Sequence, residues 1–475
     1  MTTRALVRPL ALWADGARAA AGLVFLAVAG ASVGWLAADT LNLRLALAAA
    51  LATLAVGVAT VSPKALLVGV VVWLSALGTL RRVVAGVAGD SSYDLLLLVG
   101  PLALALLVAV AVTRGGFAAR GALANAVLAL AVLSLAGVFN PLQGSLAAGV
   151  AGLLFVFVPM LAFWIGRGLC TDRTLRLVLL LVAALGIPAA LYGLAQTFLG
   201  FPAWDTAWIE KVGADYLGLL VGAAIRPFSS FSSAAEYAVF VALALVVWVA
   251  FGFRSLRIPF VIAPIGLLVT ALVVSSTRGA VVVAAAALSL MACASRRLPI
   301  LPGLALSAVL LVGLSAGVQR IGTPDSTGAA STLVSHQIEG LADPLDPTAL
   351  NLGVHLSLIG SGLRSALDDP FGVGIGSVNL AAVKFGGEIR STEADPSNIA
   401  VALGIPGLVA YLLIVVLGFR KAYELARRRR DALSLAVLGV LAVTVLQWLN
   451  GGHYAVAVLP WLVLGWVDRS SARRR

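Results

Sequence analysis

The chain has 475 residues, of which 61% are hydrophobic and 11% are charged, and its mean hydropathy is +1.04. A water-soluble fold of this size needs much more polar surface, so a soluble protein is excluded. Many separate apolar runs are about 17–23 residues long, which is enough to cross a hydrocarbon core of about 30 Å. We therefore expect an all-α polytopic membrane protein with about twelve to fourteen transmembrane helices.

The predicted spans are apolar runs bounded by charged or turn-forming residues. In the first part of the chain they fall near 19–37, 45–61, 65–80, 95–113, 122–138, 146–165 and 177–199. In the remainder they fall near 233–252, 258–275, 279–294, 298–317, 397–418, 433–449 and 454–467. The first run follows a basic stretch as a signal peptide does, but further spans follow at once, so we expect an uncleaved helix.

Charge predicts the orientation of the chain. With the N-terminus inside, the inner connections hold most of the 33 Lys and Arg residues and few of the 21 Asp and Glu residues. This bias is typical of cytoplasmic loops, so we expect both termini in the cytoplasm of a bacterium and a multi-pass protein in its cytoplasmic (inner) membrane. The net charge of +12 is then a topology signal and does not indicate nucleic-acid binding. The two cysteines are too few for a disulfide framework.

Two polar segments are too long to be simple connections, and both are predicted to lie outside. They run from about 200 to 232 and from about 318 to 396. Long segments on one face often carry function. We expect a first transmembrane part over 1–317 with about eleven helices, an extracytoplasmic loop with short helices over 318–396, and a last transmembrane part over 397–475 with about three helices.

The first candidate site is "RPFSSFSSAAEYAVF", which begins at Arg226. A lone arginine followed by four serines stands before a membrane helix on the face predicted to be net negative. It can be an interfacial arginine whose head reaches the lipid headgroups. Alternatively, the guanidinium, the serine hydroxyls and the helix N-terminus converge on phosphate oxygens and form an anion site.

The second candidate is Arg278 in "VVSSTRGAVVVA", where only "SSTRG" separates two apolar runs. This position lies at or just below the outer interface, where an unpaired charge costs at least about 2–3 kcal/mol. Because so short a connection would not carry arginine without a partner, we favour a functional role for Arg278.

The long outer segment contains "HLSLIGSGLRSALDDPFGVGIGSVN", which begins at His355. Its first part has helical spacing and ends at Asp369 before a proline. The glycines of "GVGIG" are explained by a flexible turn, since a dinucleotide fingerprint would need a soluble βαβ unit. The three histidines are scattered and no paired-ligand motif is present, so we expect no bound metal and no cofactor.

The third candidate is the start of the span in "RSTEADPSNIAVALGIPGLVAYLLIV", where Arg390, Glu393 and Asp395 precede an apolar run. Asp395 suits an N-cap and Pro396 suits the first helical position. A solvated helix end accounts for these charges on its own. They are also placed where a reaction site on the outer face could use them.

Residues 170–420 resemble the O-antigen ligase / O-antigen polymerase family of bacterial membrane glycosyltransferases. The resemblance rests on the order of Arg226 with "PFSSF", "STRGA" around Arg278, and a long outer loop with "DPFGVGIG" that leads into "SNIAVALGIPGLVAYL". It implies a polyprenyl-diphosphate-linked (undecaprenyl-type) glycan donor and a glycan or lipid-glycan acceptor outside the cytoplasmic membrane. Ligases of the family usually carry a His-Asn pair about eleven residues before the "GIPG" element. Here Glu393 and Ala394 stand in that place, which favours a polymerase over a ligase.

The resemblance also implies roles for individual residues. Glu393 or Asp395 would be the general base that takes a proton from the acceptor hydroxyl, with His355 as the next candidate. Arg226 and Arg278 would bind the leaving diphosphate without a metal. The remaining candidates for binding glycan or phosphate are Arg364, Lys384, Arg390 and His355.

Two other function classes remain open. A transporter or flippase for a lipid-linked or small anionic substrate would explain outer arginines but not the long loop that returns charges to a helix start. A non-catalytic scaffold of an envelope complex would tolerate exchange of Arg278. The sugar, the linkage and the choice between polymerase and ligase are not encoded in any motif of the chain.

Overall fold

The computed structural model describes residues 40–88, 94–117, 121–213, 218–255, 258–318, 328–342, 352–379, 381–386, 388–392, 394–449 and 454–472. Over these residues the chain is helical almost throughout, so the predicted all-α class is confirmed. The predicted span at 19–37 lies outside the described residues.

The helices that build the body of the protein correspond one by one to the remaining predicted spans. They are α2 (Thr40–Val61), α3 (Pro63–Ala88), α4 (Val99–Thr113, preceded by the 3-10 turn η1, Leu95–Leu98), α5 (Ala122–Gly137), α6 (Leu146–Leu169), α7 (Asp172–Phe198), α9 (Ala234–Ser255), α10 (Ile258–Val274), α11 (Arg278–Ser295), α12 (Ile300–Val318), α17 (Asp395–Arg429), α18 (Ala432–Val443) and α19 (Val458–Ala472). Among the described residues, eight helices are long and apolar enough to cross a membrane, judged by length and composition.

Helix α18 is shorter than the predicted span at 433–449. It ends at Val443, and the chain then turns through Leu446, whose φ is +64°. The carbonyl of Leu446 accepts the backbone N–H of Asp395 at 2.9 Å, and the N–H of Leu449 donates to the Asp395 carboxylate at 2.8 Å. The segment after α18 therefore leaves the helix to bind the start of α17.

The two long polar segments fold into short elements. The first contains α8 (Ala203–Val212) and a hairpin of β1 (Leu220–Val221) and β2 (Ala224–Ile225), and the second contains α13 (Ala329–Ala342), α15 (Leu352–Asp368) and α16 (Ala381–Lys384). In the hairpin Leu220 pairs with Ile225 and Val221 with Ala224.

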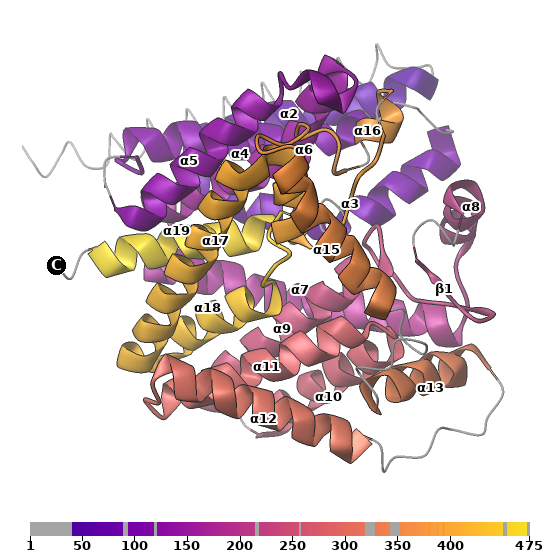
Figure 1. The fold of residues 1–475 in the computed structure, drawn as a ribbon. Helices are drawn as coiled ribbons and strands as arrows, with labels where there is room; N and C mark the ends of the chain where they lie inside the picture. The colour runs from indigo at the N-terminus through magenta and orange to yellow at the C-terminus, as the bar shows by residue number, and fades with distance from the viewer. Residues whose placement is uncertain are drawn as a thin grey trace, which may run out of the picture.

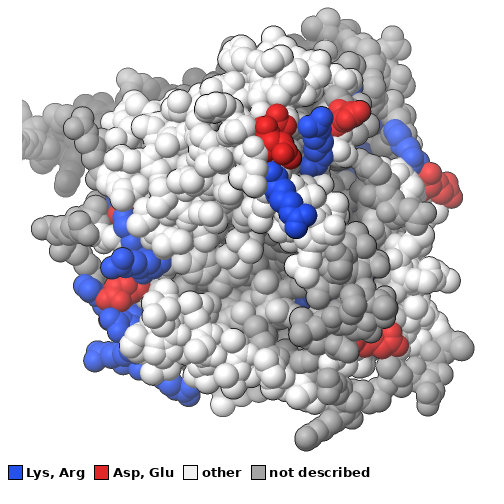
Figure 2. Space-filling model, in the orientation of Figure 1, with Lys and Arg blue, Asp and Glu red and all other residues white. Residues whose placement is uncertain are grey.

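Figure 1 shows α8, β1, α13 and α16 on the right, at the end of the helix bundle away from the C-terminus. A group of Lys and Arg side chains lies at the opposite end, on the left of Figure 2. The two long segments therefore share one end of the bundle.

The core of the lower half in Figure 1 surrounds α9, which packs against α7, α10, α11 and α18. Its side chains from Tyr237 to Val247 are almost all buried because the sequence is apolar around the whole helix. Helix α15 crosses in front of the bundle and packs against α17, while α13 packs against α10, α12 and the hairpin. The packing of α13 and the hairpin brings parts of the two long segments together.

Helix α17 is bent at Gly404, whose φ of +64° and ψ of −156° are not helical. Pro406 has no N–H, so the carbonyl of Ala402 has no helical partner. The segment 370–374 supplies the missing bonds: Gly374 N donates to Ala402 O at 3.0 Å, Val373 N donates to Val401 O at 2.9 Å, and Ile405 N donates to Pro370 O at 2.9 Å. A side chain at Gly404 would collide with the backbone of Pro370, so glycine is required there.

The "GVGIG" run is therefore not a flexible turn, and that prediction is wrong. Its residues are buried, and the connection between α5 and α6 binds it through Asn140, which donates to Gly372 O at 2.8 Å, and Gln143, which accepts from Gly376 N at 3.1 Å. Gly376 packs directly on the backbone of Ala148 in α6. The glycines allow this close backbone packing, which the sequence pattern alone does not reveal.

Candidate functional site

The structure brings Arg226 and Arg278 together, although 51 positions of chain lie between them. Arg226 follows β2, and its backbone N–H donates to Leu219 O at 2.8 Å, which closes the hairpin. Arg278 is the first residue of α11 and follows Ser276, whose φ is +52°. Burial lowers the pKa of Arg226, and the nearby charge of Arg278 lowers it further. The two predicted phosphate-binding arginines thus lie near enough for their charges to act on each other.

His336 of α13 is the third member of this site. Its Nε2 lies 2.6 Å from Nη2 of Arg278, and its Nδ1 lies 2.7 Å from the hydroxyl of Ser276. A guanidinium can only donate, so Nε2 must accept and the ring proton must be on Nδ1. Burial and the charges of Arg278 and Arg226 lower the pKa of His336 to about 4. The imidazole is therefore neutral at pH 7.

Gly340 lies one helical turn after His336 and makes room for Arg278. A Cβ at Gly340 would overlap Nε, Cδ and Cζ of Arg278. The helical spacing places His336 and Gly340 on the same face of α13, where Leu333 packs against Val221 of the hairpin. Leu333 thus packs α13 on the hairpin, and the missing side chain at Gly340 leaves space for the side chain of Arg278.

Several polar atoms at this face are buried without a partner among the described residues. They are Nε of Arg226, Nε of Arg278, and both side-chain polar atoms of Gln337, whose side chain is 0% exposed. Leaving a buried polar group without a hydrogen bond costs about 1–3 kcal/mol, so native proteins rarely keep several in one place without a use for them. We refer to Arg226, Arg278, His336 and Gln337 as the open cluster.

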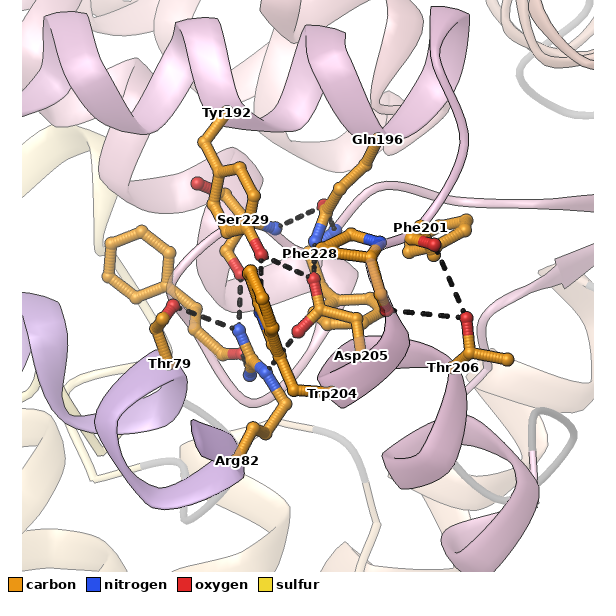
Figure 3. A network of polar contacts seen from close by, with 12 residues as sticks. Thr79, Arg82, Tyr192, Gln196, Phe201, Trp204, Asp205, Thr206, Phe228 and Ser229 are labelled. Atoms are coloured by element: carbon orange, nitrogen blue, oxygen red, sulfur yellow. Dashed lines mark hydrogen bonds and ion pairs between the residues drawn. The ribbon is translucent and has the colours of Figure 1, made fainter. Parts of the chain in front are cut away.

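A second arginine centre includes Ser229, three residues after Arg226, and has a different character (Figure 3). Arg82 of α3 is buried and pairs with Asp205 of α8, from Nε to Oδ1 at 2.6 Å. Its remaining nitrogens donate to Phe231 O at 2.7 Å, Ser229 O at 2.5 Å and the hydroxyl of Thr79 at 3.1 Å. Every nitrogen of this guanidinium has a partner.

The partners of Asp205 complete this centre. Its Oδ2 accepts from the hydroxyl of Tyr192 at 2.6 Å and from Nε2 of Gln196 at 2.7 Å. Gln196 accepts in turn from the backbone N–H groups of Phe228 and Ser229, at 3.1 Å and 2.7 Å. We refer to Arg82, Asp205, Tyr192, Gln196 and Ser229 as the closed network. It holds the segment that follows Arg226 and so positions that arginine.

Two of the four serines after Arg226 are engaged within the protein and not with an anion. The hydroxyl of Ser229 is buried and donates to Ala189 O at 2.7 Å. Ser233 caps α9 by accepting from the N–H of Glu236 at 3.1 Å, while Glu236 accepts from Ser232 N and Ala455 N. The N-terminus of α9 is therefore occupied by its own side chains. Of the predicted anion site, Nε of Arg226 is unpaired among the described residues, whereas these two hydroxyls are engaged.

Asp395 does not cap α17, so the N-cap prediction is wrong. The cap position is Ala394, and the carboxylate of Asp395 is buried and turned inward. Its Oδ2 accepts from the hydroxyl of Tyr411 at 2.6 Å and from Leu449 N at 2.8 Å. The start of the helix is held by Asn398, whose Oδ1 accepts from the backbone and the hydroxyl of Thr392. Asp395 thus joins α17 to the segment after α18.

The second oxygen of Asp395, Oδ1, is buried and has no partner among the described residues. Asp395 borders a cavity of about 10 Å³, which also touches Asn379, Asn398 and Phe155. This volume suits about one water molecule and is far too small for a sugar. Among the described residues, the carboxylate is therefore buried beside a space that cannot hold an acceptor sugar.

The other predicted site residues are dispersed. Arg364 lies exposed on α15, Lys384 is exposed at the end of α16 with its ammonium 5.9 Å from the ring centre of Phe385, and Arg390 is exposed. His355 lies on α15 outside the part of that helix whose side chains the structure describes, and Glu393 lies outside the described residues. No contact recorded among the described residues joins Arg364, Lys384 or Arg390 to the open cluster.

Sequence reasoning missed His336 and Gln337. The sequence places their segment, "STLVSHQIEGLA", only within the long loop, and its three histidines are far apart in the chain. The spacing of Leu333, His336, Gln337 and Gly340 along one helical face was the available signal, but it does not say which partner that face meets. Within the described ranges, no three His, Cys, Asp or Glu side chains gather closely enough to hold a metal ion.

Neither a model of a known protein family nor any curated protein matches this chain. The resemblance to the ligase and polymerase family is therefore supported by the sequence motifs alone. Any proposal about function has to be argued from the geometry of the open cluster.

Proposed function

We propose that the protein is a membrane glycosyltransferase that moves a glycan from a polyprenyl diphosphate to a sugar hydroxyl of an acceptor. The observation that supports this most is the meeting of Arg226, Arg278 and a neutral histidine around buried, unpaired N–H groups. Two guanidiniums that form no ion pair with a carboxylate of the described residues suit a multiply charged anion such as a diphosphate. A neutral imidazole beside them suits proton transfer.

The diphosphate is the leaving group in this reaction. Negative charge grows on the oxygen that links the phosphate to the anomeric carbon as that C–O bond breaks. The two guanidiniums stabilise this charge. Arginine forks can hold two phosphate oxygens at once, which fixes the direction of departure. The closed network supports this role because it holds the backbone on which Arg226 is mounted.

We assign the general base to His336 in place of Glu393 or Asp395. The acceptor hydroxyl gives its proton to Nε2 of His336, its oxygen forms the new bond to the anomeric carbon, and the bonding electrons of the old C–O bond leave with the diphosphate. Asp395 is a poor candidate because its free oxygen Oδ1 borders a space of about 10 Å³, too small for a sugar, and Tyr411 and Leu449 bind Oδ2. Its contacts support a structural role at the bend of α17.

The placement in the cell is part of the same proposal. Both termini lie in the cytoplasm, about twelve to fourteen helices span a bacterial cytoplasmic membrane, and the site faces outward. The gathering of the two long segments at one end of the bundle and of basic side chains at the other supports this orientation. Polymerisation and ligation need the same chemistry, so the identity of the acceptor separates them.

The decisive experiment uses the purified full-length protein in liposomes with a lipid-linked glycan and an acceptor, without any ion gradient. We expect transfer in wild type and a loss of about 10²–10⁴-fold in His336→Gln. Ser331→Ala, which changes an exposed hydroxyl contact on the same helix, is the matched control and should transfer normally. Movement of the donor across the bilayer without any transfer would support the transporter alternative and overturn the proposal.

Orientation has its own test in intact cells. The native cysteines Cys170 and Cys293 are buried, so a cysteine introduced as Ala329→Cys at the exposed start of α13 is the reactive thiol. It should react with an impermeant maleimide in intact cells. Labelling only after the membrane is permeabilised would place α13, and the site with it, in the cytoplasm.

A further inference from the structure

The contact between Arg278 and His336 occupies the atom that the proposed reaction needs. Nη2 of Arg278 donates to Nε2 of His336 at 2.6 Å, while Nδ1 is engaged with Ser276 at 2.7 Å. A neutral imidazole has one lone pair in the ring plane, and here it is on Nε2. As long as Arg278 holds this position, which we call its His-bound position, His336 cannot accept a proton from an acceptor hydroxyl.

The His-bound position of Arg278 is specific but not locked. Gly340 provides the space for the guanidinium, since any Cβ there would overlap it. The Nε of Arg278 is nevertheless buried and unpaired, and no carboxylate of the described residues forms an ion pair with this arginine. Arg82, by contrast, is held by Asp205 and three other acceptors. Arg278 can therefore exchange its histidine contact for a better acceptor without breaking an ion pair.

A diphosphate is such an acceptor. A neutral imidazole nitrogen offers one lone pair and no charge, whereas a diphosphate offers several charged oxygens that a guanidinium can bind two at a time, with opposite charges attracting. Arg226 increases the attraction because its own guanidinium carries no carboxylate partner among the described residues. An anion between the two arginines would draw Arg278 away from the imidazole.

We infer that Arg278 blocks His336 until a diphosphate binds, so that the general base becomes available only when the glycan donor occupies the site. This inference rests on the proposed function and adds an order to it: donor first, acceptor activation second. The same guanidinium would then perform two tasks in sequence, covering the base and stabilising the leaving group.

The charged groups recorded around His336 are Arg278 on α11 and Arg226 after β2, and Glu339 on α13 acts on Arg278. Both arginines, together with burial, keep the pKa of the imidazole low. Removing the contact with Arg278 and adding a negative ligand both act in the opposite direction. The titration of His336 therefore reports whether the block has been released.

The test uses the full-length protein in nanodiscs with ¹⁵N-labelled histidine, with inorganic pyrophosphate as the probe. The chain has only three histidines, and the signal lost in His336→Gln identifies the one of interest. We expect the pKa of His336 to rise by at least one unit at saturating pyrophosphate, with a shift of the Nε2 resonance. Gly340→Ala should raise this pKa without pyrophosphate, because the added Cβ displaces the guanidinium of Arg278 from the imidazole. The variant still contains the arginine and its charge.

The outcomes separate the two proposals. If calorimetry shows that pyrophosphate binds and that Arg226→Ala weakens it at least tenfold, but the His336 resonance does not move in wild type, the blocking role is overturned and the diphosphate site stands. If pyrophosphate does not bind, or binds equally well in Arg226→Ala, the diphosphate site itself is wrong. The wild-type titration needs no variant, so it decides the question even if Gly340→Ala does not fold.

Discussion

The open cluster and the closed network are two arginine centres carried partly by the same short segment. Arg226 belongs to the first, while Ser229, three residues later, belongs to the second. In the closed network each nitrogen of Arg82 has an acceptor, and a carboxylate balances its charge. In the open cluster two like charges meet around a neutral ring, and several N–H groups have no partner. The number of partners, and not burial alone, distinguishes the two centres, and on our proposal it separates an arginine that holds the fold from one that binds a ligand.

The largest expected effect concerns the open cluster. Arg226→Ala and Arg278→Ala should each reduce glycan transfer by at least about 10²-fold, because each removes a donor to the leaving diphosphate. Lysine should rescue poorly, since a point charge cannot bind two oxygens as a fork. Because Arg226→Ala removes one of two neighbouring like charges, its melting temperature in detergent should stay the same or rise, whereas Arg278→Ala also loses the hydrogen bond to His336 and should lose at most about 1 kcal/mol of stability. A large fall in melting temperature would mean that these arginines also hold the fold, and the comparison would fail.

The closed network should respond in the opposite way. Arg82→Ala leaves Asp205 buried without its counter-charge, and breaking a buried pair from one side costs about 3–5 kcal/mol. We expect the loss to appear as early unfolding in detergent and low yield, measured by thermal scans. Properly folded Arg82→Ala with normal stability but no transfer would move Arg82 into the binding site.

Acid should destabilise the protein through His336. Its pKa is lowered from 6.5 to about 4 in the folded chain, so the unfolded chain binds the proton more readily between these values. The contribution of His336 to the free energy of unfolding is constant above about pH 6.5 and decreases as the pH drops toward about 4. Melting curves of wild type and His336→Gln over this range isolate the effect. If both proteins lose stability in parallel, His336 is not the group responsible.

The smallest effect is expected at Asp395. Asparagine can still accept from Tyr411 and from the Leu449 N–H, so Asp395→Asn should cost about 1 kcal/mol or less and leave transfer within threefold. Tyr411→Phe removes one of the same bonds and should cost a similar amount. A dead but stable Asp395→Asn enzyme would return the carboxylate to the reaction site and weaken the assignment of His336.

Sequence alone predicted the all-α class and the position of nearly every long helix, because each membrane-spanning helix appears in the sequence as a long uninterrupted apolar run. It also selected Arg226 and Arg278, since a charge beside a membrane span is costly and stands out. It missed His336 and Gln337, whose meaning depends on α13 packing against a hairpin about a hundred residues earlier. It misjudged the glycine run and Asp395 because their partners, Gln143, Ala402 and Leu449, are distant in sequence or are backbone atoms. Such partners leave no local pattern.

The bend of α17 at Gly404 has a consequence for biogenesis. A helix entering the bilayer from the translocon normally satisfies its own backbone, but α17 needs the segment 370–374 for the bonds that the bend and Pro406 remove. That segment is synthesised just before α17 and is itself bound by the connection between α5 and α6, made more than two hundred residues earlier. We therefore expect α17 to insert stably only when α5, α6 and the segment 370–374 are in place to supply these bonds.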